Sequence, residues 1–218
     1  MPSERDKPPF IAGVRDAAIP RVVHQIWLQG AERPQEPLLS YMDGVRAACE
    51  RGDWRYLLWC EADVRLLPSE CRSLWDVYRP GCCHLSQVSN LLRYLILWEL
   101  GGLYLDADIE VFTLPEELSG AWIAGKHGVG ARDAGVVNVC AMAAEPHHPY
   151  LGRIVDRFPG IDWGEHLSAG SALGLAALDR DVSRWPREAW HGHPRNPRSY
   201  GYHHSLGKTC ESFTPFAK

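Results

Sequence analysis

The sequence has 218 residues, 45% of them hydrophobic and nine of them tryptophan, so it can bury a substantial core and is not intrinsically disordered. The formal net charge of −4 argues against a protein whose main partner is a polyanion, although a local basic groove is compatible with it. No apolar run reaches the roughly 20 residues that span a bilayer, and the polar N-terminus is unlike a signal peptide. We therefore expect a single cytoplasmic domain without a transmembrane segment.

The first part of the chain predicts a βαβ unit. Residues 1–18 are polar and predict a flexible arm ahead of a domain that covers 19–218. Residues 19–27 predict a first strand, residues 37–51 a helix and residues 54–59 a second strand. In open α/β sheets, ligands bind at the carboxyl ends of the strands. Trp27 lies at such an end, so it is either a core side chain or a flat surface on which a nucleotide base stacks.

The most informative stretch is 84–112, HLSQVSNLLRYLILWELGGLYLDADIEVF. Its apolar residues keep a helical spacing, and Ser86 or Ser89 can cap the start of the helix. The glycine pair at 101–102 ends the helix, because glycine accepts a left-handed backbone without steric cost. Residues 103–105 are apolar and few, which predicts a short buried strand.

Two carboxylates follow this strand. Asp106 and Asp108 are two residues apart, so in extended backbone both lie on one face, roughly 6–7 Å apart at the backbone. Paired oxygen ligands at a strand end suit Mg²⁺ or Mn²⁺ that carries substrate phosphates. The sequence therefore predicts a hard-cation site at this position.

The second half of the chain predicts further α/β structure. Residues 122–124 and 136–143 predict strands, residues 149–158 and 168–178 predict helices, and the glycine-rich stretch 125–135 predicts a loop. The strand at 136–143 holds one polar residue, Asn138, whose buried amide needs partners. This amide can hold a sugar hydroxyl, or it can only tie loops together.

The segment from about 180 to 218 is rich in proline, histidine and arginine. One interpretation is a solvated surface loop. The other is that it closes over the Asp106–Asp108 pair, adds a metal ligand and brings cations to a diphosphate. The seven cysteines form no CxxC pair and predict reduced thiols. The Cys82-Cys83-His84 cluster could bind zinc, but a structural zinc site needs four ligands.

Three blocks carry a resemblance to a known family. They are IPxxxHQIW at 19–27, SNLLRY at 89–94 and GGLYLDAD at 101–108, and WRYLLW at 54–59 matches a second strand. Together they resemble the DXD sugar transferases, with glycosyltransferase family thirty-two as the most similar group and the clostridial glucosylating toxin core as a more distant one. That family contains initiating mannosyltransferases and capsular polysaccharide transferases. The resemblance covers residues 19–159.

The resemblance implies a GT-A fold, which is a single α/β domain with a mixed, mostly parallel sheet flanked by helices. It also implies a UDP- or GDP-sugar donor, Mn²⁺ or Mg²⁺ as cofactor, and transfer of a hexose with retention. The acceptor stays open between a glycan, a lipid-linked sugar, a protein and a modified nucleic acid. The expected metal ligands are Asp106, Asp108 and His203, the catalytic residues are Asp106, Asp108 and Arg93, and the donor-binding residues are Trp27, Gln25, Asn90, Arg93, Tyr104, Asp106, Asn138 and Lys208.

Two departures from the family pattern leave alternatives open. Asn90 stands where the family has aspartate, and Lys208-Thr209 stand where it has a Ser-Trp pair. A catalytically degenerate module that binds sugar nucleotide or metal is therefore one alternative. A DxD metal-dependent phosphatase is another, but that chemistry expects threonine or a similar residue two positions after the second aspartate, where this chain has Glu110.

Overall fold

The computed structural model describes residues 19–29, 34–116, 118–125, 137–163 and 182–206. The main sheet consists of β1 (Val22–Ile26), β2 (Arg55–Trp59), β3 (Gly102–Leu105), β5 (Ala121–Gly125), β6 (Val137–Ala144) and β7 (Ser183–Trp185). A second sheet pairs β4 (Ile109–Val111) with β8 (Gly201–His203). The helices are α1 (Leu38–Arg51), α2 (Ser69–Tyr78), α3 (Leu85–Leu100), α4 (Pro149–Val155) and α6 (Arg187–His191), with 3-10 turns at Glu61–Leu66, Arg79–Gly81 and Phe158–Gly160.

The main sheet is mixed, with strand order β2-β1-β3-β6-β5-β7. β1 runs parallel to both of its neighbours, β2 and β3, and β7 runs parallel to β5. β6 is antiparallel to both β3 and β5. The predicted α/β fold with a mixed, mostly parallel sheet is therefore confirmed. The predicted arm at 1–18 and the predicted helix at 168–178 lie outside the described residues, as does nearly all of the predicted loop at 125–135.

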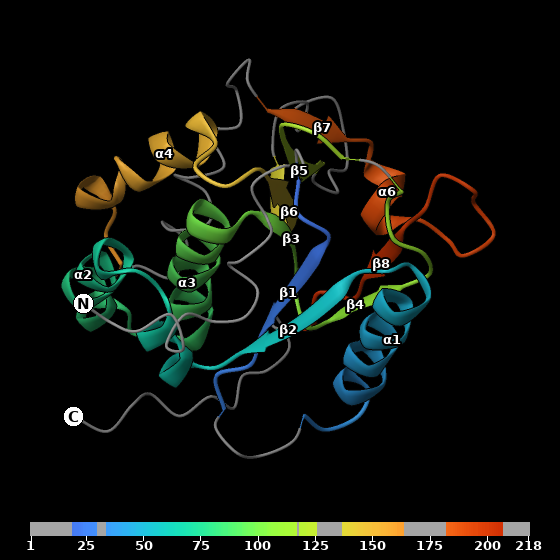
Figure 1. Ribbon diagram of the computed structural model, residues 1–218. Coiled ribbons are helices and arrows are strands. Elements are labelled where there is room, and N and C mark those ends of the chain that lie inside the picture. Colours follow the sequence, from blue (N-terminus) through green and yellow to red (C-terminus); the bar gives the residue numbers. More distant parts are fainter. Residues whose placement is uncertain (1–18, 30–33, 117, 126–136, 164–181, 207–218) are drawn as a thin grey trace.

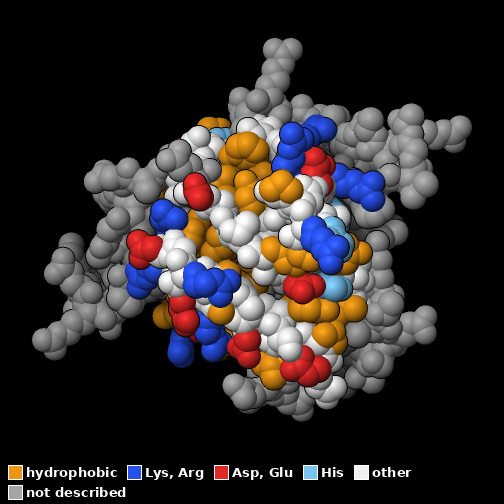
Figure 2. All heavy atoms as spheres, turned by 90° about the vertical axis from the view of Figure 1, so that its right-hand side faces the viewer, with side chains coloured by type: hydrophobic (Ala, Val, Ile, Leu, Met, Phe, Trp, Pro, Cys, Tyr) orange, Lys and Arg blue, Asp and Glu red, His pale blue; other side chains and the backbone are white. Residues whose placement is uncertain are grey.

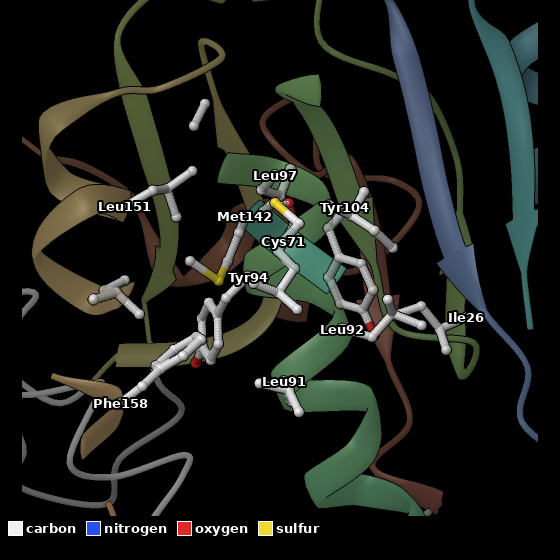
Figure 3. Close-up of a cluster of buried hydrophobic side chains, with 14 of the residues drawn as sticks. Ile26, Cys71, Leu91, Leu92, Tyr94, Leu97, Tyr104, Met142, Leu151 and Phe158 are labelled. Atoms are coloured by element: carbon white, nitrogen blue, oxygen red, sulfur yellow. Dashed lines mark hydrogen bonds between the residues drawn. The ribbon is translucent and has the colours of Figure 1, made fainter. Parts of the chain in front are cut away.

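Helices cover both faces of this sheet (Figure 1). α2, α3 and α4 lie on one face, whereas α1, α6 and the β4–β8 sheet lie on the other. Each face has its own hydrophobic core. Figure 3 shows part of the first core, in which Leu92 of α3 and Tyr104 of β3 lie close to Ile26 of β1. α3 is the central helix, because its residues 91–97 are all buried.

The turn from α3 into β3 depends on two glycines. Gly101 and Gly102 both have positive φ, 63° and 95°. A Cβ on Gly101 would lie 2.7 Å from the Ala144 carbonyl oxygen, and a Cβ on Gly102 would lie 2.6 Å from that of Val22. Other residues are therefore excluded by strain and by contact. The chain needs this tight reversal to bring the strand that carries the aspartates back beside β1.

The predicted cap at the start of α3 is wrong. His84 is the N-cap residue, and its side chain accepts from the third helical residue, Gln87, whose side chain in return accepts from the His84 backbone N–H. Ser86 and Ser89 lie inside the helix. The sequence pattern favoured serine because serine is common at caps, but a histidine acceptor satisfies the same free N–H groups.

Four short elements were not predicted from the sequence, and three of them lie in the last described segment. β4, β7, α6 and β8 have three to five residues each, too few to show a periodic pattern. The surface over this side of the molecule mixes acidic, basic and histidine side chains without a single charged field (Figure 2). No helix among the described residues is both long and apolar enough to cross a membrane.

Candidate metal and donor site

The two aspartates lie where the chain leaves the main sheet. The Asp106 backbone N–H still donates to the Cys140 carbonyl of β6, at 2.8 Å, so Asp106 continues the β3 ladder. The chain then turns, with the Ile109 N–H donating back to the Asp106 carbonyl at 3.2 Å, and enters β4. The extended backbone predicted for this segment is therefore wrong. The carboxylates share one site because the turn, rather than strand alternation, directs both of them towards His203.

Asp106 is held by side chains from α3 and β3. Its Oδ1 accepts the Tyr104 hydroxyl at 2.8 Å and pairs with Arg93 Nη2 at 3.0 Å. The Arg93 guanidinium also lies over the Tyr104 ring, 4.3 Å from the centroid. Burial raises the pKa of Asp106, and the charge of Arg93 opposes that shift. Oδ1 is thus fully engaged, whereas Oδ2 faces His203.

Arg93 is almost completely buried, with 5% of its side chain exposed. Its Nη1 donates to the Val139 carbonyl at 2.6 Å, and its Nη2 lies 3.4 Å from Ser89 Oγ. Burial works to lower the pKa of Arg93, but Asp106 raises it overall, so the guanidinium stays charged. Its buried Nε has no hydrogen-bond partner among the described residues. Because a buried donor without a partner is costly, this N–H is suited to an oxygen of a bound ligand.

Asp108 is held by the C-terminal segment instead. Its Oδ1 lies 3.2 Å from His203 Nε2, and its Oδ2 accepts the Leu206 backbone N–H at 2.7 Å. Its backbone carbonyl accepts the His204 N–H at 3.1 Å. Burial works to raise the pKa of Asp108, but the hydrogen bond and charge of His203 outweigh burial and lower it overall. Asp108 is therefore an ionised carboxylate at neutral pH.

His203 bridges the two aspartates. Its Nε2 lies 3.2 Å from Asp108 Oδ1 and 3.7 Å from Asp106 Oδ2. Burial works to lower its pKa, but the hydrogen bond to Asp108 and both carboxylate charges raise it overall. On the other side of the ring, Nδ1 lies 3.4 Å from Asn138 Nδ2 and 3.4 Å from Ser205 Oγ. Ser205 can therefore accept an Nδ1–H when Nε2 binds a cation.

The residue types and distances fit a divalent cation. Ligand atoms of Asp106, Asp108 and His203 all lie within 4.8 Å of one another. Two carboxylates and one imidazole suit Mn²⁺, and the carboxylates also suit Mg²⁺, since both ions prefer oxygen ligands. Such a cation would replace the proton that His203 shares with the carboxylates.

A second layer of buried side chains supports the turn. Gln25 is fully buried, and its amide donates to the Asp106 carbonyl at 3.1 Å and accepts the Tyr56 hydroxyl at 2.9 Å. Trp59 Nε1 donates to His24 Nδ1 at 3.0 Å, so His24 Nε2 carries the proton and donates to the Gly101 carbonyl at 2.9 Å. Burial lowers the pKa of His24 to about 4. Direct donor contact by Gln25 would require its amide to leave these hydrogen bonds.

The other expected donor-binding residues are placed as follows. Trp27 is partly exposed directly after β1, at the same edge of the sheet as Asp106, because β1 and β3 are parallel neighbours. Asn90 is partly exposed one helical turn before Arg93. The Oδ1 of Asn138 accepts a hydrogen bond from the Cys140 backbone N–H at 3.0 Å, so the NH₂ group of Asn138 faces His203. Lys208 lies outside the described residues.

Sequence reasoning missed three contributors to this site. His24 belongs to the first motif, but its apolar neighbours gave no sign that its ring would hold the Gly101 turn. Tyr56 sits in the mostly apolar strand RYLLW, where nothing in the sequence marked its hydroxyl as the group that orients Gln25. The Leu206 backbone N–H has no side-chain signal at all. A long-range contact of this kind becomes visible only when the C-terminal segment is seen beside β4.

The comparisons with known proteins agree with this geometry. Residues 46–120 match the family described as "Glycosyltransferase sugar-binding region containing DXD motif". This stretch includes α3, the glycine pair and both aspartates. The resemblance predicted from the three sequence blocks is therefore confirmed.

Several known proteins are similar to the chain, among them two curated relatives and one solved structure. Inositol phosphoceramide mannosyltransferase 3 of Schizosaccharomyces pombe is 26% identical over 188 residues, covering 81% of this chain and 49% of that protein. Lactosylceramide 4-alpha-galactosyltransferase of Homo sapiens is 24% identical over 201 residues, covering 81% and 52%. The PaToxG glycosyltransferase structure aligns with a TM-score of 0.53 at 18% identity, covering 74% of this chain and 69% of that one.

The fold and the comparisons define one class of protein. The fold is of the GT-A type, as predicted, and the matched family and relatives are glycosyltransferases, so the predicted class is confirmed at that level. The chain spans about half the length of the curated relatives it matches. The similarity therefore does not identify the donor, the acceptor or the metal of this chain.

Proposed function

We propose that this chain is a metal-dependent glycosyltransferase that moves a hexose from a nucleoside-diphosphate sugar to a hydroxyl acceptor. The observation that carries the proposal is the convergence of Asp106, Asp108 and His203 at the carboxyl end of β3, with ligand atoms within 4.8 Å of one another. In a sheet of this kind, that edge is where nucleotides bind. The cation, when bound, neutralises charge that develops on the departing diphosphate.

Each side chain then has a definite task. Asp106 and Asp108 provide carboxylate oxygens, and His203 is the third ligand once its Nε2 is unprotonated. Arg93 fixes the Asp106 carboxylate, and we assign its buried Nε–H, which has no partner among the described residues, to an oxygen of the donor. Trp27, partly exposed at the same edge, stacks on the donor base. Among the described residues no third carboxylate is placed as a nucleophile, so we assign the role of base to the departing phosphate. Retention is expected from the family resemblance.

The names of the two relatives support our choice of the donor and acceptor classes to test first. One is named as a mannosyltransferase and the other as a galactosyltransferase, so a GDP- or UDP-hexose is the donor class to test first. Both of their names contain a ceramide lipid, inositol phosphoceramide in one and lactosylceramide in the other, and a headgroup hydroxyl of a ceramide lipid is therefore the acceptor class that we propose. The cytoplasmic location expected from the sequence stays a prediction.

The test is a screen of nucleotide sugars for release of nucleoside diphosphate in the presence of Mn²⁺. We expect one hexose donor to be hydrolysed, with activity lost in excess chelator and restored by Mn²⁺ or Mg²⁺. Full hydrolysis in excess chelator would contradict the role given to the two aspartates. Cation-dependent binding of the donor without any turnover, with and without ceramide-lipid acceptors, would instead identify a catalytically degenerate binding module, the alternative that Asn90 keeps open.

A further inference from the structure

His203 also belongs to a second cluster of metal-ligating side chains. Cys140, His191 and His203 offer one ligand atom each, and these atoms all lie within 4.8 Å of one another. The three residues come from β6, α6 and β8, which are far apart in the sequence. The cluster visible in the sequence, Cys82-Cys83-His84, does not bring its ligand atoms close enough together for a metal site in the described part of the chain. The Cys82 and Cys83 thiols face the carbonyls of Tyr78 and Gly81 instead.

The three ligands are held by the backbone around them. The Cys140 N–H donates to Asn138 Oδ1 and its carbonyl accepts the Asp106 N–H, so its position is fixed from both sides. A backbone bridge joins His191 to Tyr202, next to His203. The rings of His191 and His203 have centroids 5.6 Å apart and planes tilted by 58°. The cluster is thus part of the framework that positions β8 and not a chance meeting of long side chains.

The chemistry of this cluster differs from that of the aspartate site. One sulfur and two imidazole nitrogens form the set that selects Zn²⁺, whereas Mn²⁺ and Mg²⁺ prefer oxygen ligands. Tetrahedral Zn²⁺ holds such ligands roughly 3.5 Å apart, judging from its bond lengths. Closing the cluster from its present spacing needs only about an ångström of side-chain movement. Cys140 is fully buried while both histidines are partly exposed, so the histidine side of the cluster is the one nearer to solvent.

We propose that Cys140, His191 and His203 form a second metal site that binds Zn²⁺ and competes with the hard-cation site for His203. Binding forms a zinc–thiolate bond and two zinc–imidazole bonds, and the thiol proton passes to solvent together with any proton on the coordinating histidine nitrogens. A water molecule completes the four ligands. His203 then leaves Asp108, so Zn²⁺ inhibits the enzyme at a place distinct from the diphosphate. The inhibition rests on the proposed function, whereas the binding does not.

The binding test uses Co²⁺ as a spectroscopic substitute for Zn²⁺. A thiolate ligand gives Co²⁺ an intense near-ultraviolet charge-transfer band that carboxylate and imidazole ligands do not give. We expect the reduced, metal-free wild-type protein to develop this band with one equivalent of Co²⁺ and to lose it when Zn²⁺ is added. Cys140→Ser should lack the band, and His191→Gln should bind at least about tenfold more weakly, because even outer partners of metal sites contribute that much.

Two control variants separate this site from others. Cys83→Ser removes an exposed thiol beside a histidine and should leave the band unchanged. Asp108→Asn weakens the hard-cation site and should also retain it. The proposal is overturned if the wild-type protein gives no band, if Cys140→Ser keeps it, or if Asp108→Asn abolishes it. Should Cys140→Ser fail to fold, unchanged affinity in folded His191→Gln overturns it equally.

The competition is tested by activity. In the presence of Mn²⁺, Zn²⁺ should inhibit donor hydrolysis by the wild-type protein, and Cys140→Ser should need at least about tenfold more Zn²⁺ for half-inhibition relative to its own uninhibited rate. Equal sensitivity would place the inhibitory ion at the aspartates and refute the competition. A protein that shows the cobalt band but hydrolyses no donor would refute the proposed function and leave the zinc site standing.

Discussion

Asp106 and Asp108 are two residues apart, yet different regions of the chain determine their states. Side chains from α3 and β3 hold Asp106, namely Arg93 and Tyr104. The C-terminal segment holds Asp108, through His203 and the Leu206 backbone N–H. Burial raises the pKa of Asp106, whereas at Asp108 burial is outweighed by the hydrogen bonds and the charge of His203, which together lower the pKa of that carboxylate.

The site is therefore divided into two regions. The α3–β3 region forms a buried framework, with Arg93 only 5% exposed, that fixes one carboxylate before any ligand binds. The β8 region is attached to the other carboxylate by contacts that a cation would replace, because His203 Nε2 cannot hold Asp108 and a metal at once. We therefore expect changes in the framework to cost stability and changes at Asp108 to cost activity.

The largest effect is expected at Asp108. Asp108→Asn should lower Mn²⁺-dependent donor hydrolysis by about 100- to 1,000-fold, the usual loss when one stabiliser of developing charge is removed. The matched control is Glu110→Gln, which neutralises a more exposed carboxylate in the adjoining strand, paired with His204 at 3.1 Å. It should change the rate less than about threefold, in line with the small contribution of exposed ion pairs. Equal losses in the two variants would remove the special role of Asp108.

The framework itself is tested at Arg93. Arg93→Met leaves the Asp106 carboxylate without its buried cation, so the free energy of unfolding should fall by about 3 kcal/mol, measured by denaturant titration. Arg93→Met combined with Asp106→Asn should recover part of this loss, because the uncompensated charge is gone. If the double variant loses more unfolding free energy than the two single variants lose together, the stabilising ion pair between Arg93 and Asp106 is contradicted.

A pH titration tests the layer beneath the framework. The pKa of His24 is about 4 when folded and 6.5 when unfolded. Between these values the unfolded chain binds a proton that the folded chain does not, so stability falls as the pH drops. From pH 7 to pH 5 this group should cost about 2 kcal/mol of unfolding free energy. In His24→Gln, the unfolding free energy should fall by about 2 kcal/mol less than in the wild type between pH 7 and pH 5. Parallel plots of unfolding free energy against pH for the two proteins would refute this role of His24.

The smallest effect is expected at Trp27. Trp27→Ala should raise the Michaelis constant for the donor about tenfold, which corresponds to the ~1.4 kcal/mol typical of one stacked base. The turnover number should change less, since stacking serves donor binding and not the bond that breaks. An unchanged Michaelis constant together with a loss of stability would show that Trp27 is a core side chain and does not stack on the donor base.

The sequence predicted the framework well because its signals are local. The helical spacing of α3, the glycine pair and the apolar β3 all lie within one stretch of the chain. The turn after Asp106 was not predictable, because it depends on pairing between β4 and β8, about 90 residues later, and each strand has only three residues. His24 was visible as a motif residue, but its bond to the Gly101 carbonyl required the two strands to be placed side by side.

The most direct test of the proposed site is a calorimetric titration of UDP and GDP into the wild-type protein, with Mn²⁺ and with excess chelator. We predict that one nucleotide binds at least about tenfold more tightly with Mn²⁺, and that Asp108→Asn abolishes this gain while Glu110→Gln keeps it. The same affinity with and without the cation would contradict a diphosphate held through a metal at Asp106, Asp108 and His203.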